Sequence, residues 1–199
     1  MQMSATTKKL GLVVMALLWS QGAWAHPGHG PEQGFAAGFA HPWSGLDHIL
    51  AMVAVGIWAA QLGRRALWAL PLAFPLLMVA GGVIGMTHWA VPGVEVAIAL
   101  SSLVLGAMVL LQVRARTLAA SALVGVFALF HGIAHGQEIP LQASGALYGA
   151  GFVAATLMLH AVGLGLGSLH QFSAGRTVMR ASGALISAAG GVFLLNALA

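Results

Sequence analysis

Two imidazoles and a carboxylate lie at helical spacing in the segment Phe130–Glu138, whose sequence is FHGIAHGQE. His131 and His135 are four residues apart, and Glu138 follows three residues later. At 3.6 residues per turn, all three side chains project from one face of a helix. Two imidazoles one turn apart can bind a divalent metal ion, and a nearby carboxylate offsets its charge. The spacing therefore predicts a metal site; the alternative is that these histidines only hydrogen-bond between packed helices.

A second group of possible ligands lies in the segment HPWSGLDH, residues 41–48. Asp47 and His48 are adjacent, and His48 shares a helical face with Met52, four residues further on. Asp47 could instead be a charge placed favourably at the start of a helix. That alternative is weaker if this segment lies at the same membrane depth as FHGIAHGQE.

Four other histidines and one methionine are candidates for further steps of metal handling. His160 lies within a long apolar stretch, so it is expected to face the interior of a helix bundle, deeper than the other ligands. We predict that it acts as a transport relay, with Met52 and His88 as additional relay candidates. His26 and His29 are expected to open the mature chain, where they could collect metal ions.

The composition indicates the class of protein. Only 6% of the 199 residues are charged and 59% are hydrophobic, and the mean hydropathy is +0.91. These values exclude an ordinary soluble domain and are typical of a polytopic membrane protein. Ionisable groups are costly in a membrane and usually functional there, which favours metal binding over simple packing. The chain has no cysteine, so disulfides and thiolate ligands are excluded.

Basic and acidic residues alternate along the chain. A membrane protein that keeps its basic residues on the cytoplasmic side produces this alternation, and the acidic residues and most histidines then gather on the periplasmic side. Topology also explains the pI of about 10.8 without a nucleic-acid partner. The basic pairs are Lys8 and Lys9, Arg64 and Arg65, Arg114 and Arg116, and Arg176 and Arg180.

The predicted fold is all-α, a polytopic membrane protein with six transmembrane helices after a cleaved signal peptide. Residues 1–25 have the basic start, the apolar run and the small-x-small end of a signal peptide, and an uncleaved first helix is the alternative. Residues 26–40 are predicted to be a flexible, His- and Gly-rich periplasmic lead-in. Residues 41–199 are predicted to form the six-helix domain, in a bacterial inner membrane with the mature N-terminus and the C-terminus periplasmic. The expected spans are 43–62, 66–88, 94–113, 117–136, 141–168 and 181–198, each near the ~20 residues that cross a bilayer.

The segments HPWSGLDH and FHGIAHGQE, taken together, resemble the HupE/UreJ family. The matching patterns are His41-Pro42-x-x-Gly45-x-Asp47-His48 and Phe130-His131-Gly132-x-Ala134-His135-Gly136-x-Glu138, with a weaker match at Leu159-His160. A signal peptide followed by His-Pro-Gly-His and six spans is similar to that family too. The resemblance covers nearly all of the mature chain. It implies a secondary permease for nickel, with cobalt as an alternative, that serves hydrogenase or urease maturation.

The residues themselves favour the same class of substrate. Imidazole and carboxylate ligands without thiolate suit Ni²⁺, Co²⁺ or Zn²⁺ better than Cu⁺. The ATP-binding pattern Gly-x-x-x-x-Gly-Lys is absent from the sequence, which disfavours a primary pump acting alone. The predicted metal-binding residues are His26, His29, His41, Asp47, His48, His131, His135 and Glu138.

The predicted function is transport rather than catalysis. The expected partners are the metal ion, the lipid bilayer, outer-membrane or periplasmic metal suppliers, and nickel-enzyme maturation factors. Two alternatives remain. An intramembrane metal-dependent hydrolase could use the histidine pair to activate water, although no glutamate lies between the two histidines as in zincin proteases. A sensor or storage protein would bind metal without moving it.

Overall fold

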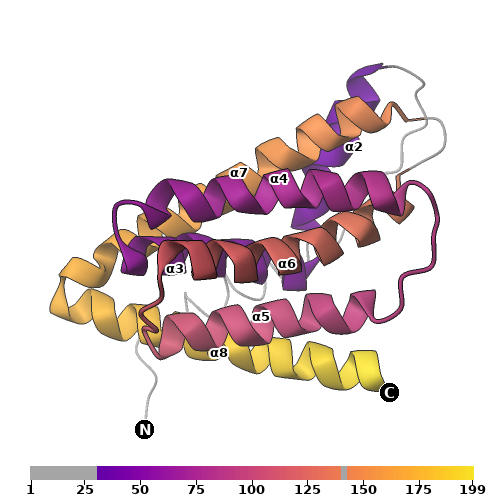
Figure 1. The fold of residues 1–199 in the computed structure, drawn as a ribbon. Coiled ribbons are helices and arrows are strands. Elements are labelled where there is room, and N and C mark those ends of the chain that lie inside the picture. The colour runs from indigo at the N-terminus through magenta and orange to yellow at the C-terminus, as the bar shows by residue number, and fades with distance from the viewer. Residues whose placement is uncertain (1–30, 140–142) are drawn as a thin grey trace, which may run out of the picture.

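The computed structural model describes residues 31–139 and 143–199, and this part of the chain is helical with short connections (Figure 1). The all-α prediction is confirmed for these residues. The predicted signal peptide and the histidines at positions 26 and 29 lie outside them. The elements are α2 (Pro31–Ala40), the 3₁₀ helix η1 (His41–Trp43), α3 (Leu46–Leu62), α4 (Ala66–Gly85), α5 (Val94–Leu110), α6 (Thr117–Gln137), α7 (Gly145–Ser168), the 3₁₀ helix η2 (Leu169–Gln171) and α8 (Ser173–Leu198).

The long helices pack in pairs, α3 with α7, α4 with α6, and α5 with α8. Glycines lie where the backbones of a pair meet. A Cβ atom at Gly132 of α6 would collide with the carbonyl of Met78 in α4, and one at Gly136 would collide with Gly82. This close contact holds one face of α6 against α4, and the histidines of α6 project from another face.

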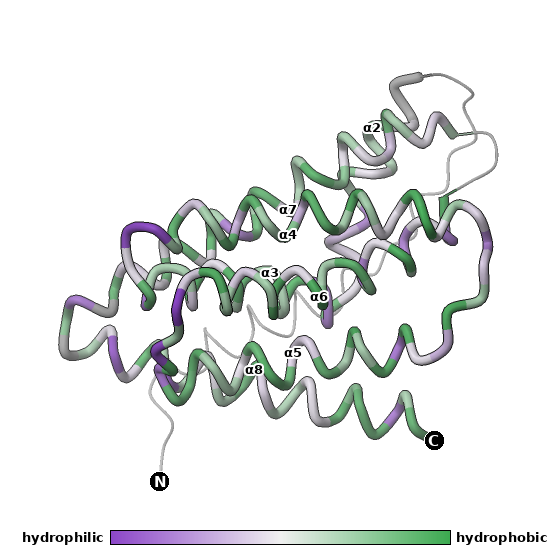
Figure 2. Tube along the Cα trace, viewed as in Figure 1, coloured by the Kyte–Doolittle hydropathy of each residue, from purple (hydrophilic) through white to green (hydrophobic). Residues whose placement is uncertain are grey.

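The six arginines of the described residues lie together at one end of the bundle, in the α3–α4 and α5–α6 connections and on the first turns of α8. Figure 1 shows the α3–α4, α5–α6 and α7–α8 connections at that end, and the α4–α5 connection and the C-terminus at the other. Figure 2 shows hydrophilic residues at these connections and largely hydrophobic helices between them. The alternation of charge along the chain thus becomes a separation of charge between two ends. Which end faces the cytoplasm remains a prediction from the positive-inside rule.

In the part of the chain that the structure describes, four helices, α4, α6, α7 and α8, are long and apolar enough to cross a membrane. The pair Gly34–Trp43 and Leu46–Leu62 passes the same test together but is bent by 82°, which gives up to five candidate spans. Helix α5 is apolar and 17 residues long, at the short limit for a span. The protein is therefore a multi-pass membrane protein, and six crossings remain a prediction.

The segment before η1 differs from the expected flexible lead-in. Residues 31–40 form α2, which lies against α7. A Cβ atom at Gly38 would collide with the Tyr148 carbonyl, and one at Gly151 would collide with the Phe35 carbonyl. The glycines that suggested flexibility instead allow two helices to touch, and composition alone does not distinguish these two uses of glycine.

Several helix ends also differ from the predicted spans. Helix α8 begins at Ser173 rather than at residue 181, so Arg176 and Arg180 lie on its first turns. Long basic side chains can extend from a helix toward the polar interface, and a basic pair therefore does not have to mark a loop. Helix α4 ends at Gly85 rather than at 88, and His88 adopts a φ of 54°.

Candidate metal centre

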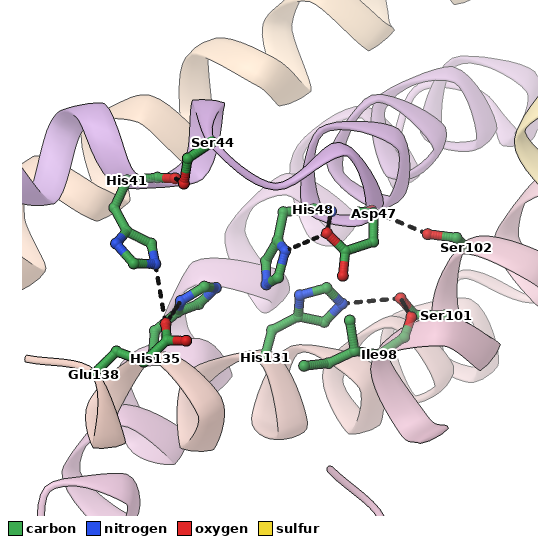
Figure 3. A network of polar contacts seen from close by, with 10 residues as sticks. All are labelled: His41, Ser44, Asp47, His48, Ile98, Ser101, Ser102, His131, His135 and Glu138. Carbon is green, nitrogen blue, oxygen red and sulfur yellow. Dashed lines mark hydrogen bonds and ion pairs between the residues drawn. The ribbon is translucent and has the colours of Figure 1, made fainter. Parts of the chain in front are cut away.

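Three elements meet at the end of the bundle opposite the arginines: η1, the first turn of α3 and the last turns of α6 (Figure 1 and Figure 3). Two overlapping groups of side chains there could hold a metal ion, each with ligand atoms within 4.8 Å of one another. The three-histidine site consists of His48, His131 and His135, all buried. The outer group consists of His41, His135 and Glu138 and is partly exposed. His135 belongs to both.

His131 is held in one orientation by a serine of α5. Its Nε2 lies 2.9 Å from Ser101 Oγ, and the Ser101 hydroxyl itself donates to the Ile98 carbonyl at 2.6 Å. Since the serine hydrogen is used in that bond, Nε2–H of His131 is the donor and Ser101 Oγ the acceptor. Nδ1 of His131 then carries a lone pair, and it is buried without a hydrogen-bond partner among the described residues.

His48 is oriented by its neighbour Asp47. His48 Nδ1 donates to Asp47 Oδ1 at 2.8 Å, and the backbone N–H of His48 donates to the same oxygen at 2.9 Å. This leaves His48 Nε2 with a free lone pair, again buried and unpartnered in the described part of the chain. A Cβ atom at position 45 would lie 2.7 Å from His48 Nδ1 and 2.9 Å from Asp47 Oδ1, so Gly45 leaves room for this contact.

Glu138 orients His135 and His41 together. His135 Nδ1 donates to Glu138 Oε2 at 3.1 Å, and His41 Nε2 donates to the same oxygen at 3.0 Å. These two hydrogen bonds, first that from His135 and then that from His41, hold the pKa of Glu138 well below its usual range. Glu138 is therefore a carboxylate at neutral pH. His135 Nε2, the remaining nitrogen, has no hydrogen-bond partner among the described residues.

These contacts orient three imidazoles so that they could bind one cation. Each histidine of the three-histidine site has one nitrogen held by an oxygen acceptor and one buried nitrogen that offers a lone pair. Acceptors on the far nitrogen fix the orientation of a histidine ligand and raise its basicity. Two of the three acceptors are carboxylates, so their charges balance a divalent cation. Three ligands leave coordination positions open.

The structure brings most of the predicted site residues together, but not all. Asp47 lies behind His48 and belongs to neither group of ligand atoms. Met52 is fully buried one turn from His48, and His88 is exposed and outside both groups. Their roles as relays stay predictions. The residues that meet as predicted are His41, His48, His131, His135 and Glu138.

The sequence analysis missed two serines of α5. Ser101 supports His131, and the Ser102 hydroxyl donates to the backbone carbonyl of Asp47 at 3.0 Å. Both serines are fully buried. The sequence feature that could have identified them is a pair of serines inside an otherwise apolar helix. Their hydroxyl groups, once buried, must find hydrogen-bond acceptors within the bundle.

The fold and the site define a multi-pass membrane protein with a candidate histidine metal centre between its helices. The family model described as HupE / UreJ protein matches residues 13–193, so the chain belongs to the HupE/UreJ family. The chain is also 46% identical over 188 residues to Protein HupE of Rhizobium leguminosarum bv. viciae. That match covers 94% of this chain and 98% of the relative. No solved structure matches the chain significantly.

Family membership excludes one of the alternative functions, the intramembrane hydrolase. The HupE/UreJ family is a family of transporters, not of enzymes. The prediction of a non-enzymatic protein is therefore confirmed, and the intramembrane hydrolase is excluded.

Proposed function

We propose that the protein is a secondary permease that carries a divalent transition-metal ion, most readily Ni²⁺, across the inner membrane. The observation that carries this proposal is the convergence of three buried imidazole nitrogens that have no hydrogen-bond partner within residues 31–139 and 143–199. Leaving such polar atoms unpaired in an apolar interior costs free energy, and a bound cation would satisfy all three at once. Co²⁺ and Zn²⁺ share the preference for imidazole and are the competing substrates.

The two ligand groups suggest an order of binding. The Glu138 side chain is 54% exposed and that of His41 is 30% exposed, whereas that of His135 is 8% exposed. A hydrated cation would first meet the carboxylate and His41, and would then pass to the three-histidine site by exchange at His135. His135 is common to both groups, with Nδ1 on Glu138 and Nε2 free for the three-histidine site, so the two groups adjoin at a single imidazole ring.

The charges of the site support a divalent substrate. Asp47 and Glu138 contribute two negative charges, and the three imidazoles are neutral when they act as ligands. A divalent cation would bring the net charge of the whole assembly to zero. A neutral assembly is the least costly one in a low-dielectric region.

The proposed partners of this permease on each side of the membrane follow from its orientation. In the six-crossing arrangement, the site opens to the periplasm and the end of the bundle that carries the arginines faces the cytoplasm. Metal suppliers of the periplasm or the outer membrane would deliver the ion, and nickel-enzyme maturation factors would receive it. An alkaline phosphatase fused after Ala199 should be active in this arrangement, whereas an inactive fusion would remove one crossing.

Uptake of radioactive ⁶³Ni²⁺ into proteoliposomes tests the proposal. The purified protein should accumulate the ion above the level of protein-free liposomes, and the double variant His131→Ala with His135→Ala should not. Calorimetric binding of Ni²⁺ by the same preparations separates two failures. Wild-type protein that binds the ion without accumulating it would be a sensor or storage protein, whereas absence of binding would contradict the metal site itself.

A further inference from the structure

His160 is a buried histidine that the three-histidine site does not include. It lies on α7, is 1% exposed, and neither ring nitrogen has a hydrogen-bond partner among the described residues. A buried imidazole with two unpaired nitrogens is costly, and a group that enters from outside the protein fold could satisfy it. Such groups in membrane-spanning helices usually mark a pathway for ions or protons.

A continuous row of aromatic rings connects His160 to the outer end of the bundle. Phe74 of α4 is fully buried and contacts the rings of both His131 and His160, so one phenyl ring separates the two imidazoles. His160 is therefore closer to the three-histidine site than its position in the sequence suggested. The centroid distances along the row are 4.8 Å for His41 and His135, 4.3 Å for His135 and His48, 4.7 Å for His48 and His131, 5.6 Å for His131 and Phe74, and 5.2 Å for Phe74 and His160.

The backbone near His160 offers an oxygen as well. Pro75 has no N–H, so the carbonyl of Pro71, four residues earlier in α4, lacks its usual helical donor. The Pro71 backbone interacts with the His160 ring, without a hydrogen bond of standard geometry. Helix α7 packs closely against α3 at His160. Gly56 of α3 permits this contact, because a Cβ atom there would collide with the His160 carbonyl.

We propose that His160 is a second, inner binding station for the divalent cation, separated from the three-histidine site by the Phe74 ring. This inference rests on the proposed permease function and adds a second step to it. One imidazole with a backbone oxygen binds a cation far more weakly than three imidazoles backed by carboxylates. A weak site is what an inner station needs, since conduction requires that an ion can leave as well as enter.

The test compares binding and transport in the same variants. His160→Ala should reduce ⁶³Ni²⁺ uptake into proteoliposomes by about tenfold or more, on the scale of losing one metal ligand. Its calorimetric Kd for Ni²⁺ should stay within about twofold of the wild type, as expected for separate sites. His160→Leu, which fills the space without a nitrogen, should behave in the same way and covers the case in which the alanine variant does not fold.

Thr156 provides the matched control. It is buried on the same face of α7, one turn from His160, and its hydroxyl contacts Met78 Sδ of α4 at 3.9 Å. Thr156→Val keeps the shape of the side chain and should leave both uptake and binding unchanged. Normal uptake in His160→Leu would overturn the inner station, and so would an equal fall of binding and uptake. Wild-type protein that takes up no Ni²⁺ would overturn the inner station and the permease together.

Discussion

His131 and His160 are both completely buried histidines on apolar helices, but their hydrogen bonds differ. His131 donates from Nε2 to Ser101, which directs its lone pair toward His48 and His135. Neither ring nitrogen of His160 has a hydrogen-bond partner among the described residues, and the ring contacts Phe74 instead. Burial of a histidine therefore does not define a tight metal site. What distinguishes the two positions is a set of oxygen acceptors that fixes each imidazole and balances the charge of the cation.

This difference has a functional meaning for a permease. A site that binds strongly selects the ion from a dilute solution, and a site that binds weakly lets it continue. The three-histidine site, proposed to bind strongly, and the proposed inner station lie on the same row of rings, with the three-histidine site nearer the exposed end. The following predictions test whether the oxygen acceptors are the cause of the difference.

Removal of two ligands should give the largest effect. The double variant His131→Ala with His135→Ala leaves His48 as the remaining member of the three-histidine site. We expect its Ni²⁺ affinity to fall by more than about 100-fold, beyond the range seen when only a supporting group is lost. Calorimetry on the purified protein measures this. An unchanged affinity would mean that the ion binds elsewhere.

Neutralising the acceptor of His48 should give the next largest effect. Asp47→Asn keeps the shape and an acceptor oxygen but removes the negative charge, and Ni²⁺ affinity should fall by about 10- to 100-fold. Glu138→Gln is the matched variant at a more exposed carboxylate and should cost less, because water screens its charge. Equal affinities for the wild type and Asp47→Asn would exclude charge balance as the basis of selectivity for divalent ions.

Displacing the same acceptor without removing it should have a smaller effect. Gly45→Ala places a Cβ atom against both His48 Nδ1 and Asp47 Oδ1, so the two side chains must shift apart. We expect an affinity loss of about tenfold, at the low end for a disturbed supporting group. Gly149→Ala is the control, because its Cβ atom would meet nothing within 4 Å. A similar loss in both variants would show that any added methyl group has this effect.

Removing the neutral acceptor of His131 should have the smallest effect. Ser101→Ala deletes one hydrogen bond, worth about 1 kcal/mol, which corresponds to roughly a fivefold loss of affinity. Ser102→Ala is the neighbouring control, since that hydroxyl contacts the backbone of Asp47 rather than a ligand nitrogen. If Ser101→Ala lost as much affinity as Asp47→Asn, orientation rather than charge would dominate the site.

The grouping of the candidate ligands on α6 was predictable from the sequence because helical spacing is local. His131, His135 and Glu138 share a face by the geometry of a single helix. The structure places His131 with His135 in one candidate group and Glu138 with His135 in the other. The helix order and most helix ends also followed from apolar length and charge. The sequence analysis considered whether HPWSGLDH and FHGIAHGQE lie at the same membrane depth, and the structure brings the two segments into contact through α3 and α6.

The supporting groups were not predictable because they depend on packing between distant helices. Ser101 reaches His131 only because α5 lies beside α6, and Phe74 separates His131 from His160 only because α4 contacts both α6 and α7. Helix α2 was missed for a related reason. Its glycines form contacts with α7, and in the sequence they look the same as the glycines of a flexible segment.

A crystal structure of the nickel-loaded protein, with anomalous scattering measured at the nickel absorption edge, tests the central claim most directly. The account predicts one strong anomalous peak bound by Nε2 of His48, Nδ1 of His131 and Nε2 of His135. Asp47, Ser101 and Glu138 should still hold the opposite nitrogens. A peak bound only by exposed groups, or one bound by His131 through Nε2 with the Ser101 contact broken, would contradict it.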